Sequence, residues 1–136
     1  MKIKSDFGYT MEIIEEGVIE YNTTVFYKTD EEISGQYEEF ITDLMKFYDR
    51  HPSTRFFVFG NEGYGVKNAN VNEKIRRQIF DLLEDPQTAR WGFYGKSDSA
   101  TNFIKILTQF TDALEKVQFF KTRDEAYNWI KNEKDK

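Results

Sequence analysis

The tripeptide Gly95-Lys96-Ser97 is the segment of the chain whose residue types come closest to a phosphate site. A P-loop holds phosphate with backbone N–H groups, a lysine and a hydroxyl, and it requires another glycine five positions earlier. That position is Arg90, and the motif should also follow the first strand, whereas strands are expected well before it. We therefore interpret Gly95 as a turn residue and one of residues 97–99 as a helix cap.

A second glycine loop, from Gly60 to Asn70, follows a strongly apolar run. The backbone N–H groups of such a loop, together with the N-terminus of a following helix, can bind an anion. The spacing of Gly60, Gly63 and Gly65 does not match the dinucleotide-binding pattern. Three interpretations stay open: a structural loop, a loop that contacts a partner, and a loop that binds a ligand phosphate.

Few residues of the chain suit metal or acid–base chemistry. There is no cysteine, and His51 is the single histidine, so a histidine-rich metal site or a catalytic triad lacks residues. Three carboxylate pairs fall in predicted turns or on solvent-facing helix positions: Glu15-Glu16, Glu31-Glu32 and Glu38-Glu39. Acid–base catalysis needs carboxylates in a water-poor cleft. We therefore expect no metal, no cofactor and no enzymatic activity.

The first half of the chain must position these residues through a hairpin, a helix, a buried strand and a second helix. Residues 9–14 and 18–21 are β-rich runs around the glycine-bearing turn 15–17. Thr29 and Glu32 form a capping box for an amphipathic helix that His51-Pro52 ends. The run from Arg55 to Phe59 is almost continuously apolar, which indicates a strand buried on both faces. A helix ending before Pro86 follows.

The second half reads as strand, helix, strand, helix. The segments are a strand at 89–95, a helix at 99–114, a strand at 117–120, and a helix that Thr122 and Glu125 cap. We expect the charged end, 131–136, to fray. Because strands and helices alternate, right-handed crossovers should make the later strands parallel. The sequence thus predicts a single α/β domain over residues 1–136, with a mixed, mostly parallel sheet of about five strands and about four helices.

Composition narrows the function classes. The formal net charge of −5 argues against a nucleic-acid binder, and no apolar run is long enough to span a membrane. The start of the chain lacks the apolar segment of a secretory signal, and the absence of cysteine favours a cytoplasmic location. Aromatic residues make up 17% of the chain. They indicate a bulky core around the sheet, or else an aromatic-lined pocket or docking surface. Aromatic side chains left on the surface could be buried in a homodimer.

The order of elements resembles that of the STAS-like domains, which include anti-sigma-factor antagonists and small bacterial proteins of the same fold. The likeness is strongest from Asn72 to Ile130, where an aromatic strand is followed by Asp124-Glu125-Ala126-Tyr127-Asn128-Trp129-Ile130. The resemblance implies a regulatory domain that works through a protein partner. Phospho-switching members carry a Ser or Thr in the loop after the central strand. The loop from Gly60 to Asn70 has neither, so that mechanism is not expected here.

The sequence therefore favours a non-enzymatic regulatory or protein-interaction domain with an unknown protein partner. The loop from Gly60 to Asn70 and the turn from Lys96 to Ser99 both follow strands that should be parallel, so both should open at the same sheet edge. The candidate contact residues are in these two loops: Tyr64, Asn68, Lys96, Ser97 and Ser99. The alternative is a small apolar-ligand or lipid binder, because the CRAL-TRIO domains share a related arrangement and aromatic residues could line a pocket.

Overall fold

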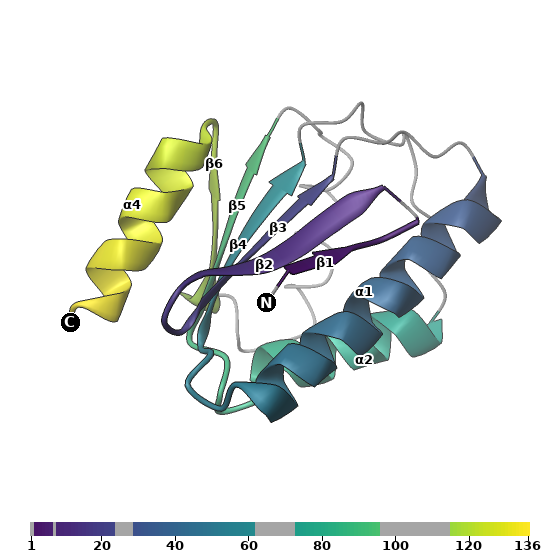
Figure 1. Ribbon diagram of the computed structural model, residues 1–136, viewed down its shortest axis with the longest axis horizontal. Coiled ribbons are helices and arrows are strands. Elements are labelled where there is room, and N and C mark those ends of the chain that lie inside the picture. The colour runs from purple at the N-terminus through teal and green to yellow at the C-terminus, as the bar shows by residue number, and fades with distance from the viewer. Residues whose placement is uncertain (1, 7, 24–28, 62–72, 96–114) are drawn as a thin grey trace.

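The computed structural model describes residues 2–6, 8–23, 29–61, 73–95 and 115–136, which form six strands and three helices (Figure 1). In chain order these are β1 (Lys2–Lys4), β2 (Tyr9–Glu15), β3 (Val18–Thr23), α1 (Asp30–Arg50), β4 (Phe56–Asn61), α2 (Glu73–Glu84), β5 (Arg90–Gly95), β6 (Val117–Phe120) and α4 (Arg123–Lys134). The helix predicted at 99–114 lies outside the described residues. The α/β class predicted from the sequence is confirmed.

All six strands belong to one sheet, and their order in space is their order in the chain, β1-β2-β3-β4-β5-β6. The pairings β1–β2 and β2–β3 are antiparallel, and the remaining three are parallel, which confirms the mixed, mostly parallel sheet. The expected count of about five strands is wrong because β1 also pairs, with Ile3 opposite Met11. At three residues, Lys-Ile-Lys is too short for its alternation to identify a strand from the sequence.

Local signals in the sequence set the helix boundaries as predicted. The Thr29 hydroxyl accepts a hydrogen bond from the Glu32 backbone N–H at 3.1 Å, and Thr122 accepts one from Glu125 at 3.3 Å. At the end of α1 the backbone N–H of His51 donates to the Phe47 carbonyl at 2.8 Å. The expected fraying is wrong for 131–134, because α4 extends through Lys134.

The face of the sheet that α1 and α2 cover, here called the aromatic face, holds most of the large buried side chains. Rings contact one another across neighbouring strands. Tyr21 and Phe59 stack with centroids 4.5 Å apart, while Phe59 and Phe93, at 4.9 Å, and Phe93 and Phe119, at 5.4 Å, meet at tilted angles. Trp91 lies within the same core, 1% exposed. These aromatic residues therefore form a bulky core, as the composition predicted.

The opposite face, here called the α4 face, has fewer buried rings than the aromatic face and includes two glycines, Gly60 and Gly92. A methyl group added at Gly92 would lie 3.4 Å from Ile130 of α4, so the missing side chain lets the helix lie close to β5. Ala126 and Ile130 are fully buried at this contact. At Gly60 the Tyr94 ring and hydroxyl occupy the space that a β-carbon would need. In Figure 1, α4 lies on the opposite side of the sheet from α1 and α2.

Candidate functional sites at the two edges of the sheet

The carboxyl edge of the parallel strands is where the sequence places its candidate contact residues. Asn61 at the end of β4 is opposite Gly95 at the end of β5, so these two parallel strands end at the same edge of the sheet. The five candidates themselves, Tyr64, Asn68, Lys96, Ser97 and Ser99, lie outside the described residues.

Arg123, the first residue of α4, is the principal described cation at this edge. Its Nε lies 2.5 Å from Glu20 Oε2 on β3, and its guanidinium lies 5.5 Å from the ring centroid of Tyr127. The hydrogen bond to Glu20 raises the pKa of Arg123 above its ordinary value. Lys131 lies over the same Tyr127 ring, at 6.0 Å. The result is a fixed, partly exposed cation–aromatic group beside the loop-bearing edge.

The register next to Arg123 places three unlike residues in one row, with Gly60 between Asn22 on one side and Tyr94 on the other. The Tyr94 hydroxyl lies above Gly60, and the Asn22 side-chain oxygen is buried without a hydrogen bond to any described residue. This row therefore has polar atoms on both sides of Gly60 near the carboxyl edge.

The amino edge of the same strands contains a cavity of about 460 Å³ that sequence reasoning missed. It lies between the starts of β4 and β5, the connection from α2 to β5, and the last turn of α4. Its lining residues are Arg55, Phe56, Pro86, Thr88, Ala89, Arg90, Lys116, Glu133, Lys134 and Lys136. Five of these are basic and one is acidic, although the whole chain has more acidic than basic residues.

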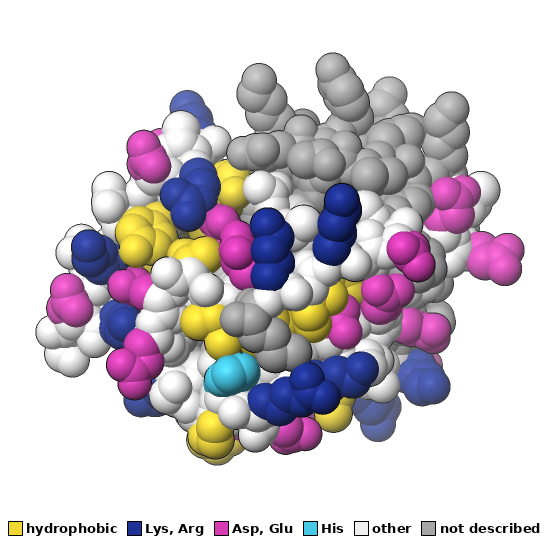
Figure 2. Space-filling view, viewed as in Figure 1, with side chains coloured by type: hydrophobic (Ala, Val, Ile, Leu, Met, Phe, Trp, Pro, Cys, Tyr) yellow, Lys and Arg dark blue, Asp and Glu magenta, His cyan; other side chains and the backbone are white. Residues whose placement is uncertain are grey.

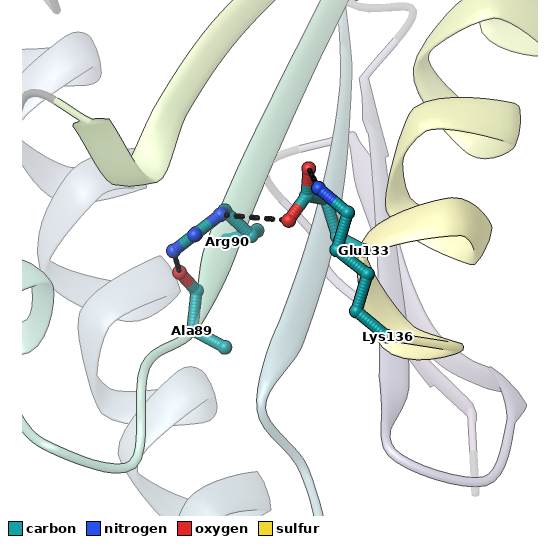
Figure 3. Close-up of polar contacts among 4 residues, drawn as sticks. All are labelled: Ala89, Arg90, Glu133 and Lys136. Atoms are coloured by element: carbon teal, nitrogen blue, oxygen red, sulfur yellow. Dashed lines mark hydrogen bonds and ion pairs between the residues drawn. The ribbon is translucent and has the colours of Figure 1, made fainter.

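Glu133 is the acidic residue of the cavity, and it contacts two of the cations (Figure 3). Its carboxylate lies 3.4 Å from Arg90 Nε and 3.1 Å from Lys136 Nζ. The hydrogen bond from Lys136, with a further contribution from Arg90, lowers the pKa of Glu133 and keeps it ionised. A terminal nitrogen of Arg90 also donates to the Ala89 carbonyl at 2.7 Å, which holds the plane of the guanidinium in place.

The other three cations of the cavity differ in their partners. Lys116 Nζ donates to the Leu83 carbonyl at 2.8 Å, where it satisfies the last turn of α2. Lys134 lies 3.9 Å from Glu15. The exposed Arg55 side chain forms no ion pair with any described residue.

A sequence signal for this cavity does exist, because a basic residue stands at or just before the start of three successive parallel strands. Arg55 precedes β4, Arg90 opens β5 and Lys116 precedes β6. The register then aligns them, since Phe56 is opposite Arg90, and Trp91 is opposite Val117. The sequence predicts a frayed end at 131–136, so it does not predict that Glu133, Lys134 and Lys136 line the cavity.

A third polar cluster, between α1 and the sheet, has a structural role. The Tyr9 hydroxyl donates to Asp43 at 2.6 Å, and both side chains are buried. Burial and the Asp43 hydrogen bond raise the pKa of Tyr9 well above its ordinary value. The Ser5 hydroxyl donates to Glu39 at 2.6 Å, so Glu39 is half-buried rather than solvent-facing as the sequence suggested.

Across the described ranges, no group of three or more His, Cys, Asp or Glu residues is arranged to hold a metal ion. No helix in this part of the chain has both the length and the apolarity to cross a membrane. No protein-family model matches the chain, and neither a curated protein nor a solved structure matches it.

Proposed function

We propose that the chain is a non-enzymatic, cytoplasmic regulatory domain of STAS-like type that acts through protein contacts at the carboxyl edge of its sheet. The observation that supports this most directly is the alignment of Asn61 with Gly95. It places at one edge the ends of the two strands that precede the loop containing Tyr64 and the turn containing Lys96. Loops held by a rigid scaffold are the usual position for binding residues.

The described side chains at this edge suit a protein contact. Arginine and tyrosine are enriched among the residues that dominate interface energies. The Arg123 side chain is 42% exposed, yet Glu20 and Tyr127 hold its position. A side chain that is already oriented loses less conformational entropy on binding, and more of its contact energy contributes to affinity.

The strand order also favours a surface contact over an enclosed ligand site at this edge. In open α/β sheets, ligands bind where the strand order reverses. The order of the described sheet does not reverse between β3 and β6. The large rings of the aromatic face pack on one another, and the described cavity is lined mainly by charged side chains, so neither favours the apolar-ligand alternative.

A quantitative pull-down from native cells tests this proposal with three double variants. Tyr64→Ala/Lys96→Ala changes the loops, Arg123→Ala/Tyr127→Ala changes the adjoining end of α4, and Lys46→Ala/Asp49→Ala is a control on exposed positions of α1. We expect both edge variants to lose a partner that the wild type and the control retain, with an unchanged far-ultraviolet circular dichroism spectrum. Equal recovery of every co-purifying protein by all three variants would contradict the choice of surface.

Two further measurements separate the alternatives. Native mass spectrometry of the protein purified from cells would reveal a co-purifying apolar mass if the chain is a lipid binder. Sedimentation at several concentrations would show whether a second copy of the chain is itself the partner.

A further inference from the structure

The cavity at the amino edge has more positive charge than its described contacts neutralise. Five cations line it, and the ion pairs within it involve two carboxylates, Glu133 and Glu15. Like charges gathered in one cavity repel one another unless a counter-charge is present. The chain has 24 acidic residues that could neutralise these cations, yet Glu133 is the one acidic residue among those that line the cavity.

Structural roles account for two of the five cations. Lys116 satisfies carbonyl groups at the end of α2, and Lys134 lies in the last turn of α4, where a cation offsets the helix dipole. Arg90, Lys136 and Arg55 remain. The first two share Glu133, and Arg55 has no ion pair among the described residues. The surplus lies on these three side chains.

We propose that this cavity binds a small phosphate-bearing anion, with Arg90 and Lys136 as its principal ligands and Arg55 at its rim. The planar donor group of arginine and the point charge of lysine both suit phosphate oxygens. The volume of about 460 Å³ lies in the range of small-molecule sites. Phe56 and Pro86 provide an apolar wall for the organic part of a phosphate ester.

Glu133 occupies the position of the anion in the structure described here. Its carboxylate lies between Arg90 and Lys136, where it accepts the contacts that a phosphate group would accept (Figure 3). A ligand must therefore compete with this internal carboxylate for the two cations. Removal of the Glu133 charge should strengthen binding, which is the reverse of what a purely structural ion pair predicts.

Isothermal titration of the full chain with inorganic pyrophosphate at constant ionic strength tests the site. We expect Arg90→Gln to weaken binding about tenfold, the equivalent of one charge-assisted hydrogen bond. Glu133→Gln should tighten it severalfold. Arg77→Gln removes the same charge from a side chain that is 75% exposed on α2, and should leave binding unchanged. Thermal denaturation of each variant without ligand confirms that it is folded.

Three results would overturn the proposal. These are no binding of pyrophosphate to the wild type, equal weakening by Arg77→Gln and Arg90→Gln, and a Glu133→Gln variant that binds no more tightly than the wild type. A comparison of phenyl phosphate with inorganic phosphate then identifies the source of the phosphate group. Tighter binding of phenyl phosphate assigns the cavity to an organic ester in contact with Phe56, and equal binding assigns it to the inorganic ion. Both outcomes of this comparison are consistent with a phosphate site in the cavity.

Discussion

The two faces of the sheet achieve burial by opposite means. On the aromatic face, large rings from neighbouring strands pack against one another, and α1 and α2 cover them. On the α4 face, glycine at positions 60 and 92 removes side chains, and one helix lies close to the strands. Basic and acidic side chains interleave over β1 and β2 in the view of Figure 2. Each candidate site includes one end of α4: Arg123 lies at its start, and Glu133 lies in its last turn. The aromatic face therefore contributes mainly to stability, and the helix on the α4 face contributes charged side chains to both candidate sites.

The two tryptophans, one associated with each face, give the largest expected contrast. Trp91 is 1% exposed and contacts Phe57 with ring centroids 5.3 Å apart, whereas Trp129 is half-buried on α4. Trp91→Ala should lower the free energy of unfolding by about 3–5 kcal/mol, because it leaves a large cavity in the core. Denaturant titration measures the loss, with Trp129→Ala as the matched variant. A larger loss for Trp129→Ala would reverse the assignment of the two faces.

The buried hydrogen bond from Tyr9 to Asp43 gives the next largest effect. Tyr9→Phe keeps the ring but leaves the Asp43 carboxylate without its buried donor. We expect a loss of about 2–3 kcal/mol in unfolding free energy. The double variant Tyr9→Phe/Asp43→Leu should recover part of it, because both polar partners are then removed together. Failure of the double variant to recover any stability would show that the hydroxyl itself is not the cause.

Gly60 tests the packing on the α4 face. Gly60→Ala places a methyl group where the Tyr94 ring lies, so the ring must move, and we expect a loss of about 1–2 kcal/mol. Gly92→Ala is the matched control and should cost less, because its new methyl group meets Ile130 at 3.4 Å. The double variant Gly60→Ala/Tyr94→Ala removes the clash. Thermal denaturation of the three variants would contradict this account if Gly92→Ala were the more damaging change.

Arg123 gives the smallest effect on stability. Its ion pair with Glu20 is partly exposed, and such pairs contribute at most about 1 kcal/mol. Arg123→Ala should therefore change the unfolding free energy only slightly, and the change should shrink at high salt as the pair is screened. Denaturant titration at two salt concentrations measures both. A loss above about 2 kcal/mol that is independent of salt would mean that this residue belongs to the core.

The fold could largely be predicted from the sequence because its signals are local. The capping residues Thr29 and Thr122 act on neighbours three positions away, and the apolar run of β4 reveals its own burial. The cavity depends instead on residues far apart in the chain, such as Arg55, Arg90 and Glu133, which meet only once strand register and the course of α4 are known. The carboxyl-edge surface stays a prediction, supported by the alignment of the strands that lead to it.

The agreement between strand order and chain order has a consequence for how the protein is made. From β2 onward each strand pairs with the one that preceded it during synthesis, so no strand must wait for a later one to be inserted between them. The sheet can therefore grow in the direction of translation. Each parallel pairing, such as Val18 with Phe56, must still close a long crossover connection, and non-local pairing of this kind is slow. Until α4 is complete, Val58 and the other apolar residues of the α4 face lack their cover. We expect a nascent chain to be most prone to aggregation during that interval, which ends when α4 packs on this face.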